Sequence, residues 1–443
     1  MTNVEPRVLR GFRDYLPSKM IPRQKMLCEI ERVFQSFGFV PLMTPALEYL
    51  DILTGKYGEE GDSLLYRFKD QGERDVALRY DLTVPLARVV AQYPEITMPF
   101  RRYQIAPVWR AEKPARGRFR EFVQCDGDIV GSRDMAADAE IVVLACELLS
   151  ALGVEGFVVR VNNRRVLSGL MARVGVPAGA GETGVLRTID KLPKIGKEEA
   201  ARLLREENGL DAGQVKGIFE FLEVQGDPST MISELRRLLA SSEVGARGAD
   251  ELAEVASIVK GVGLEARMEL DLSIARGLNY YTGTIYEAFL SSLPGYGAVI
   301  GGGRYDSLIG IFKGEEIPGV GISLGVDRLL EGLVELELFK EQASVARVLV
   351  TVFDAATAPY SARVASMLRS RGIACELFPA YQKIGKQFRH AERSAERWVV
   401  VAGPDEQARN EVSVKDLDTG QQEAVPIDAL ADYIQSRIGA GGG

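Results

Sequence analysis

The side chains with the clearest chemistry lie between positions 101 and 120. Seven basic residues and one acidic residue give this segment a charge of +6 (7 − 1), inside a chain of 443 residues whose net charge is −8. These residues are Arg101, Arg102, Arg110, Lys113, Arg116, Arg118 and Arg120, with Glu112 as the acid. Clustered guanidinium groups suit two-pronged contacts with phosphate. The segment predicts a phosphate site, and a solvated surface hairpin remains the alternative.

A second candidate segment, SIARGLNYYTGTIYEAF, combines Arg276, Tyr280 and Tyr281 with several glycines. Glycine lets a ligand or another backbone come close. Neighbouring residues of a strand face opposite ways, so only one of the two tyrosines can share a face with a given glycine. A buried aromatic strand with an ion-paired arginine explains the same pattern, and the residues alone favour that structural explanation.

A third segment, YGAVIGGGRYDSLIG, is followed by PGVGISLGVDRLL. Gly301, Gly302 and Gly303 predict a tight turn and a close backbone approach. The spacing matches neither a Walker loop nor a dinucleotide-binding fingerprint. An ATP site here would be of another kind. Arg328, at a predicted strand–helix junction, could clamp a phosphate or simply pair with a surface acid.

Near the end of the chain, Lys386, Arg389, Arg393 and Arg397 recur at intervals of 3, 4 and 4 residues. On a helix they would form one basic stripe, with Glu392 and Glu396 one position round from it. A stripe of this kind is usually a solvated face. Charge alone therefore gives only weak support for contact with nucleic acid.

The predicted elements that would position these side chains are a mixture of helices and strands. The pattern predicts helices over 20–38 and 134–152, a hairpin over 64–80, and strands over 101–109, 119–130 and 267–290. Asp81 is expected to cap a helix that follows it. Pro41 and Pro45 place the segment around them at the edge of a sheet or at an interface.

The pattern divides the chain into three regions. Residues 1–167 and 263–335 predict a large α+β body on an antiparallel sheet, and residues 168–262 predict a helical insertion. Alternating strands and helices over 345–438 predict a small α/β domain with a mixed or parallel sheet.

Composition narrows the function classes. A net negative charge restricts nucleic-acid contact to local patches. One histidine and four dispersed cysteines argue against a His-based metal site, a zinc ribbon and a Ser-His-Asp triad. No signal-peptide pattern and no membrane span of about 20 apolar residues is evident. We expect a cytoplasmic protein with no metal ion bound by its own side chains.

Taken in order, these segments resemble the histidyl-tRNA synthetase family over almost the whole chain. Residues 110–128 resemble the family's class II motif 2, and Gly325-Val326-Asp327-Arg328 resembles motif 3. Residues 275–281 (ARGLNYY) resemble the histidine-binding peptide, and residues 78–83 (LRYDLT) resemble the segment that holds the substrate amino group. The region around Pro45 resembles motif 1, which forms the dimer interface.

The resemblance implies a class II synthetase fold with a C-terminal anticodon-binding domain, and a homodimer that uses ATP with Mg²⁺, histidine and tRNA(His). It implies catalytic roles for Arg276 and Arg110. The implied ATP contacts are Arg110, Glu112, Arg118, Phe122 and Arg328. The implied histidine contacts are Asp81, Thr83, Gln124, Asp128, Arg276, Tyr280, Tyr281 and Tyr305. The implied tRNA contacts are Lys113, Arg116, Lys386, Arg389 and Arg393.

Two positions depart from the family pattern, because Asn279 replaces a usual Asp and Val123 replaces a usual His or Tyr. Neither change removes an arginine expected at the phosphates. The main alternative is the synthetase-like regulatory subunit of ATP phosphoribosyltransferase, which lacks the C-terminal domain. A synthetase-derived RNA-binding or signalling module without chemistry is a third possibility, and the intact set of arginines argues against it.

Overall fold

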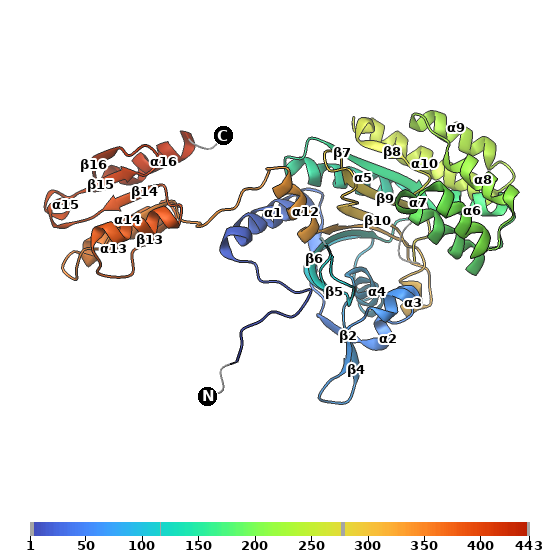
Figure 1. The fold of residues 1–443 in the computed structure, drawn as a ribbon, viewed down its shortest axis with the longest axis horizontal. Coiled ribbons are helices and arrows are strands. Elements are labelled where there is room, and N and C mark those ends of the chain that lie inside the picture. The colour runs from blue at the N-terminus through green and yellow to red at the C-terminus, as the bar shows by residue number, and fades with distance from the viewer. Residues whose placement is uncertain (1–3, 116, 276–279, 441–443) are drawn as a thin grey trace. The chain divides into compact units, whose positions relative to one another are not determined.

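The computed structural model describes residues 4–115, 117–275 and 280–440. The chain divides into two compact units, Met1–Arg13 with Met26–Phe339 and Asp14–Lys25 with Lys340–Gly443. Figure 1 shows their elements. Within the described ranges, no helix has both the length and the apolar character needed to cross a membrane.

The first unit is built on an eight-stranded sheet in the order β1-β5-β6-β11-β10-β9-β7-β8. Its strands are β1 (Val40–Pro41), β5 (Phe100–Trp109), β6 (Glu121–Val130), β7 (Phe157–Asn163), β8 (Met268–Leu270), β9 (Thr284–Leu290), β10 (Ile300–Arg304) and β11 (Gly319–Gly325). The strands from β5 to β7 pair antiparallel, and β1 and β8 add parallel edges. The predicted antiparallel sheet, with Pro41 at its edge, is confirmed.

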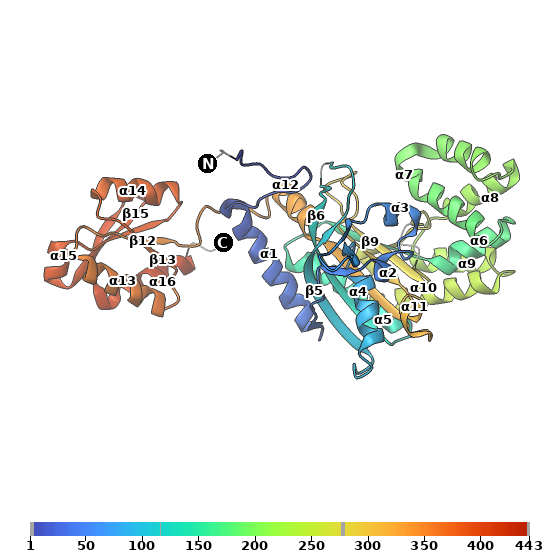
Figure 2. The ribbon, with the colours of Figure 1, turned by 90° about the horizontal axis from the view of Figure 1, so that it is seen from below.

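One face of this sheet packs against helices α1 (Pro17–Ser36) and α5 (Met135–Ala151). Figure 2 shows α1 running beside β5. A Cβ placed on Gly127 of β6 would lie 2.5 Å from the Phe34 ring of α1, and Phe34 stacks on Tyr103 with ring centroids 5.4 Å apart. Arg304 of β10 bonds Asp138 of α5. Odd-numbered β6 residues therefore face the helices, and even-numbered residues face the opposite side.

The opposite side carries a smaller sheet and short helices. The small sheet has the order β2-β4-β3, and its strands are β2 (Leu47–Tyr49), β3 (Arg67–Lys69) and β4 (Asp75–Leu78). The helices of this region are α2 (Leu50–Leu53), α3 (Gly58–Ser63), α4 (Thr83–Gln92) and α11 (Gly310–Lys313). The β3–β4 pair confirms the predicted hairpin.

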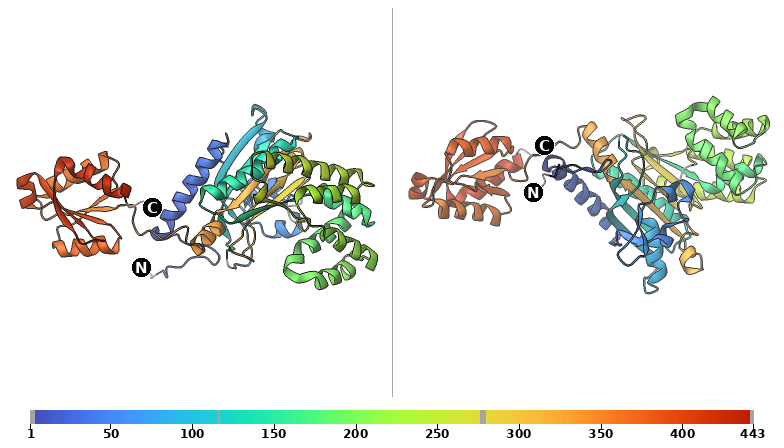
Figure 3. Two further views of the ribbon diagram at one scale, coloured as in Figure 1. Left: turned by 90° about the horizontal axis from the view of Figure 1, so that it is seen from above. Right: turned by 60° about the horizontal axis from the view of Figure 1, so that its bottom comes forward.

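Between β7 and β8 the chain is helical. The helices are α6 (Arg164–Arg173), α7 (Ala180–Glu206), α8 (Ala212–Leu222), α9 (Pro228–Leu238) and α10 (Glu243–Gly261), followed by the short turn η1 (Glu265–Arg267). Asp211 and Asp227 cap two of them through side-chain oxygens. A Cβ on Gly169 would lie 2.5 Å from the Gly245 Cα, so α6 and α10 pack backbone to backbone. Figure 3 shows α10 lying beside α5.

The second unit has a five-stranded mixed sheet in the order β13-β12-β14-β15-β16. Its elements are β12 (Val348–Val350), α13 (Ala358–Ser370), β13 (Cys375–Leu377), α14 (Ile384–Arg393), β14 (Trp398–Val401), α15 (Pro404–Arg409), β15 (Glu411–Asp416), β16 (Gln422–Pro426), η2 (Ile427–Ala429) and α16 (Leu430–Ala440). Helix α14 covers one face of the sheet, and α13 and α16 cover the other (Figure 2). The predicted α/β pattern with a mixed sheet is confirmed.

Several local predictions are wrong. Gly301–Gly303 form the central strand β10 and not a tight turn, because the small residues let β10 pack closely against its neighbours. The predicted strand over 267–290 is two strands separated by a loop that includes Tyr280 and Tyr281. Helix α14 ends at Arg393, so Arg397 is not part of a helical stripe and pairs with Asp416 instead. Strand β7 has no counterpart among the predicted elements.

The helix α12 (Val326–Glu335) completes the first unit and follows β11 directly. This arrangement confirms the predicted strand–helix junction at Arg328.

Candidate active site

The face of the large sheet turned away from α1 and α5 carries a band of polar side chains. Strand register sets Arg102 opposite Asp128, and Gln104 opposite Asp126, on β5 and β6. Residues directly opposite each other in an antiparallel pair lie on the same side of the sheet. Gln124 shares this side because it is two residues from Asp126. Strand pairing thus gathers carboxylate, amide and guanidinium groups on one surface.

The next two strands present glycines on the same face. Asp128 pairs with Gly321 on β11, and Gly321 pairs with Gly303 on β10. A Cβ on Gly321 would lie 2.0 Å from the Asp128 Oδ1, and one on Gly303 would lie 2.8 Å from the Tyr281 ring. No side chain other than hydrogen fits at either position. The polar band therefore borders a floor made of backbone, which allows a ligand to approach closely.

Arg110 lies just after β5 at the start of the charged loop. Its guanidinium carbon is 4.3 Å from the centroid of the Tyr80 ring and 5.1 Å from that of the Phe122 ring. The Nε atom donates to the Tyr80 carbonyl at 3.2 Å. Stacking on two rings fixes the plane of the guanidinium group. Phe122 belongs to the same face of β6 as Gln124, so Arg110 stands at the margin of the polar band.

Asp81 is buried at the start of α4. It accepts hydrogen bonds from the Tyr57 hydroxyl at 2.9 Å, the Val84 amide at 3.2 Å and the Tyr280 hydroxyl at 3.2 Å. The hydrogen bond from the Val84 amide ties Asp81 to the first turn of α4, but the residue at the N-cap position is Leu82, one residue later than predicted. Burial raises the pKa of Asp81, and these hydrogen bonds and the nearby Arg110 oppose that rise.

Asp128 is held by two partners, Arg102 on β5 and Tyr305 just after β10. The Tyr305 hydroxyl donates to its Oδ1 at 2.6 Å, and Arg102, which is fully buried, forms an ion pair with its Oδ2 at 2.8 Å. Burial raises the pKa of Asp128, while Arg102 and Tyr305 counter it. The same Arg102 nitrogen also donates to the Leu82 carbonyl at 3.1 Å, which ties the sheet to the start of α4.

Asp126 and Tyr281 occupy the centre of this surface. Burial raises the pKa of Asp126 to about 7, Arg102 lowers it, and the neighbouring Asp128 raises it. The Tyr281 pKa is also raised, first by burial and then by the carboxylates of Asp126, Asp128 and Asp81. Tyr281 contacts Tyr280 edge-on at 5.1 Å. Asp81, just before α4, and the two acids of β6 thus surround the pair Tyr280 and Tyr281.

Helix α12 is tied to the same strand. The Asp327 carboxylate accepts the Val123 amide of β6 at 2.8 Å and pairs with Arg13 at 3.2 Å. The neighbouring Arg328 bonds the Tyr296 carbonyl through its guanidinium group. A Cβ on Gly117 would lie 3.7 Å from the Arg328 Cγ. The charged loop that begins at Arg110 therefore passes over Arg328.

The other predicted contacts vary in position. Glu112 and Arg118 pair at 3.6 Å within the charged loop, and Lys113 is exposed there. Thr83 hydrogen-bonds Tyr280. Gln124 donates to the Ser323 hydroxyl at 2.6 Å. Arg116 and Arg276 lie outside the described residues, as does Asn279. Lys386, Arg389 and Arg393 are exposed on α14, which belongs to the second unit.

Sequence reasoning did not assign Tyr57, Asp126 or Ser323 to the site. It counted Arg102 among the basic residues of a phosphate site, whereas Arg102 pairs with the buried Asp128. The alternation of Gln124, Asp126 and Asp128 along a predicted strand was a usable signal, since such residues share one face. Tyr57 and Ser323 come from segments with no distinctive pattern. Only tertiary packing and strand register bring them to the site.

Comparison with known proteins matches two family models to the chain. The model described as histidyl-tRNA synthetase matches residues 11–329, and the model described as anticodon binding domain matches residues 346–437. The first match contains all of the polar surface described above. The second covers most of the Lys340–Gly443 part of the second unit.

Similar full-length proteins agree with this assignment. A histidine–tRNA ligase of Rhodopirellula baltica is 42% identical over 98% of this chain and 99% of its own length. A histidyl-tRNA synthetase structure from Nostoc sp. PCC 7120 has a TM-score of 0.88 and 34% identity, and the match covers 98% of this chain and all of that one.

A Bacillus halodurans structure described as an ATP phosphoribosyltransferase regulatory subunit/histidyl-tRNA synthetase has a TM-score of 0.73 at 22% identity, covering 87% of this chain and 97% of that one. At that identity the likeness concerns the fold alone, so it gives the regulatory alternative no better support. The extent of the first family model and the identity to the Rhodopirellula baltica protein over both full lengths decide the matter: the chain belongs to the histidyl-tRNA synthetase family.

Proposed function

We propose that this chain joins histidine to tRNA(His) at the expense of ATP. In the first step a carboxylate oxygen of histidine attacks the α-phosphorus and diphosphate leaves. In the second step a terminal ribose hydroxyl of the tRNA attacks the acyl carbon and AMP leaves. The observation that carries the proposal is the surface where Arg110 borders the buried acids Asp81 and Asp128. Such a surface suits a substrate that is cationic at one end and meets a phosphate at the other.

We assign the nucleotide to the margin of that surface. Arg110 would hold the α-phosphate, and Arg328 the γ-phosphate, because the charged loop lies against both. Phe122 would stack on the adenine, with Glu112 and Arg118 beside it. Arg276 is assigned to the reacting carboxylate and α-phosphate on its sequence motif alone. Charge stabilisation by fixed guanidinium groups is worth most where water is excluded.

We assign histidine to the acidic centre. Asp81, Thr83 and Gln124 would hold the α-amino group. Asp128, Tyr281, Tyr280 and Tyr305 would surround the imidazole. The Tyr305–Asp128 bond of 2.6 Å supports this, since it fixes an acceptor for an imidazole N–H. An amino acid without that N–H could not donate to Asp128, which disfavours it relative to histidine.

Mg²⁺ is proposed to accompany ATP, and it would neutralise phosphate charge. Magnesium in such sites is bound mostly by phosphate oxygens and water, with one or two carboxylates. Glu287 of β9 is half-buried and pairs with Gly301, which places its carboxylate on the glycine-floored face. Its oxygen chemistry fits the ion, and we assign it as the protein ligand.

For tRNA, we propose that Lys113 and Arg116 contact the acceptor end and that Lys386, Arg389 and Arg393 contact the anticodon region. The match of residues 346–437 to an anticodon-binding model supports the second assignment. We retain 1–167 with 263–335 as the catalytic core, 168–262 as the insertion and 345–438 as the anticodon-binding domain. A homodimer through the region of Pro45 and a cytoplasmic site of action complete the proposal.

Histidine-dependent exchange of labelled diphosphate into ATP tests the first step directly. Purified chain with ATP, Mg²⁺ and each of the twenty amino acids should exchange with histidine only. Arg276→Ala should abolish exchange and leave the unfolding temperature within about 2 °C of the parent, as expected if the lost interaction is with substrate and not with the fold. A folded chain that exchanges with no amino acid would refute the proposed activity.

The tRNA assignment has its own test. Replacing Lys386, Arg389 and Arg393 together by Gln should lower the rate of tRNA charging and leave diphosphate exchange unchanged. The control exchanges Lys216, Lys260 and Arg236 for Gln, which removes the same charge from helices of the first unit. Equal loss of charging and exchange would contradict an anticodon role for these three residues.

A further inference from the structure

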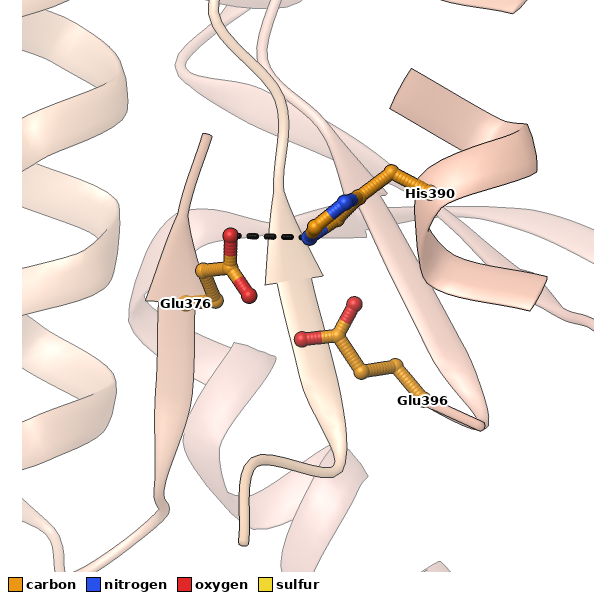
Figure 4. A group of neighbouring side chains, drawn as sticks. All are labelled: Glu376, His390 and Glu396. Atoms are coloured by element: carbon orange, nitrogen blue, oxygen red, sulfur yellow. Dashed lines mark hydrogen bonds and ion pairs between the residues drawn. The ribbon is translucent and has the colours of Figure 1, made fainter. Parts of the chain in front are cut away.

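The second unit contains a group of side chains that the proposed function does not use. Glu376 lies on strand β13, His390 on helix α14, and Glu396 in the turn before β14. One ligand atom from each residue lies within 4.8 Å of the others. Figure 4 shows the three side chains pointing toward one another from these separate elements.

The fold brings this group together on one face of the sheet. Glu376 and Val399 both pair with Leu349 of β12, so they share the side that α14 covers. The apolar residues Leu349, Phe378, Ala391 and Val399 pack beneath α14. The backbone amide of Glu396 donates to the Ala391 carbonyl at 3.0 Å, which fixes the turn against the helix.

Glu396 is the unusual member of the group. Glu396 is only 2% exposed, and neither of its carboxylate oxygens accepts a hydrogen bond from any described residue. Within the described ranges, no Lys or Arg forms an ion pair with it either. A buried carboxylate without a donor is costly unless a cation or a proton compensates it. The side chain faces His390 and Glu376, so any compensating charge would come from that direction.

The neighbouring groups are suited to a metal ion. The His390 Nε2 lies 3.0 Å from the Glu376 Oε1. The side chains of His390 and Glu376 are 39% and 33% exposed, which gives an ion a path to the buried Glu396. Ligand atoms around a tetrahedral zinc ion lie about 3.4 Å apart, since each bond is roughly 2.0–2.2 Å. The present spacing, up to 4.8 Å, is wider than that value, so the side chains would draw together around a bound ion.

We propose that Glu376, His390 and Glu396 form a binding site for a divalent transition-metal ion of the zinc class. One imidazole and two carboxylates favour such an ion over Mg²⁺, which prefers oxygen alone. Three protein ligands leave one position for water.

This inference revises our expectation from composition. A single histidine argued against a metal site bound by several histidines, but two carboxylates can complete the ligand set. The bound ion would fasten α14 to β13 and to the turn before β14. Because α14 also carries Lys386 and Arg389, the ion would fix the orientation of that basic surface. The site lies wholly in the second unit and does not depend on the proposed activity.

The uniqueness of His390 makes the test direct. The full chain, prepared without a histidine tag and labelled with ¹⁵N-histidine, contains one imidazole and gives one pair of ring-nitrogen resonances. Titration with Zn²⁺ in excess Mg²⁺ should shift the Nε2 resonance and saturate at one equivalent. Resonances that stay unchanged through several equivalents would overturn the proposal and leave a proton shared between Glu376 and Glu396 as the compensating charge.

Variants separate the site from general surface binding. Glu396→Gln and Glu376→Gln should each weaken Zn²⁺ binding about 100-fold, because loss of a ligand costs at least as much as loss of a supporting partner. Glu392→Gln, an exposed change of the same charge on α14, should bind as the parent does. If Glu396→Gln fails to fold, the more exposed Glu376→Gln still decides. Parental affinity in Glu376→Gln would overturn the proposal.

Discussion

Replacing Asp126 by Asn should make the first unit more stable above neutral pH. The pKa of this carboxyl group is raised from 3.8 to about 7 in the folded chain. Between these values the folded state therefore binds more protons than the unfolded state, so the free energy of unfolding falls as pH rises. The amide introduced by Asp126→Asn does not titrate, so this part of the pH dependence would disappear.

The size of the effect follows from the shift. A rise of roughly three pH units corresponds to about 4 kcal/mol at about 1.4 kcal/mol per unit, which is an upper limit because a folded site can relax around a charge. Geometry adds a smaller gain. The Asp126 Oδ1 and the Gln104 Oε1 both lack a hydrogen-bond donor, and the two residues are direct partners across β5 and β6. The side-chain amide of the Asp126→Asn variant would supply a donor.

Trp109 and Trp398 are the two tryptophans of the chain, one in each unit. In a Trp398→Phe background, urea unfolding followed by fluorescence reports on the first unit alone. We expect Asp126→Asn to differ little from its parent near pH 3.5, below the unfolded pKa, and to exceed it by 2–4 kcal/mol, roughly, at pH 8. The exposed Asp51→Asn should show no such divergence. Parallel pH profiles for Asp126→Asn and its parent would refute the reasoning.

Three further predictions concern the same sheet. Tyr305→Phe removes the hydroxyl that donates to Asp128. The KM for histidine in diphosphate exchange should rise by about 5- to 150-fold, which corresponds to about 1–3 kcal/mol. An unchanged KM would mean that Tyr305 does not contribute to histidine binding. Gly321→Ala places a methyl group against Asp128. It should lower the free energy of urea unfolding by about 1–3 kcal/mol and remove most of the exchange activity. Full activity would mean that β11 can shift to make room for the methyl group. Arg304→Ala leaves the buried Asp138 without its ion-pair partner and should lower the free energy of unfolding by about 3–5 kcal/mol. Adding Asp138→Leu should restore part of that stability. If it restores none, the loss comes from packing and not from the unpaired charge.

The sequence predicted most elements and the family, for a physical reason. Amphipathic periodicity identifies helices such as α5 and strands such as β5 and β6 without knowledge of their neighbours. The motif residues were recognisable because the phosphate and carboxylate chemistry expected of them restricts residue type. That is why Arg110, Asp81 and Asp128 could be proposed before the structure was known.

The failures occurred where a neighbour decides the conformation. The glycines of β10 indicate a turn when read alone, yet they form a strand. At Gly302, Tyr286 and the β11 backbone fill the space that a side chain would need. The burial of Arg102 opposite Asp128 depends on strand register. Glu396 was expected on a solvated helical face, but α14 ends before it and the following turn buries it.

The glycine floor has a consequence for how substrate preference can change. Glycine has no side chain to remove, so every substitution at Gly303 or Gly321 adds atoms that would press against Tyr281 or Asp128. A roomier site could arise only from the rim, where Tyr281 and Tyr305 can be shortened. Directed evolution toward bulkier amino acids should therefore enrich changes at those tyrosines and leave the two glycines untouched.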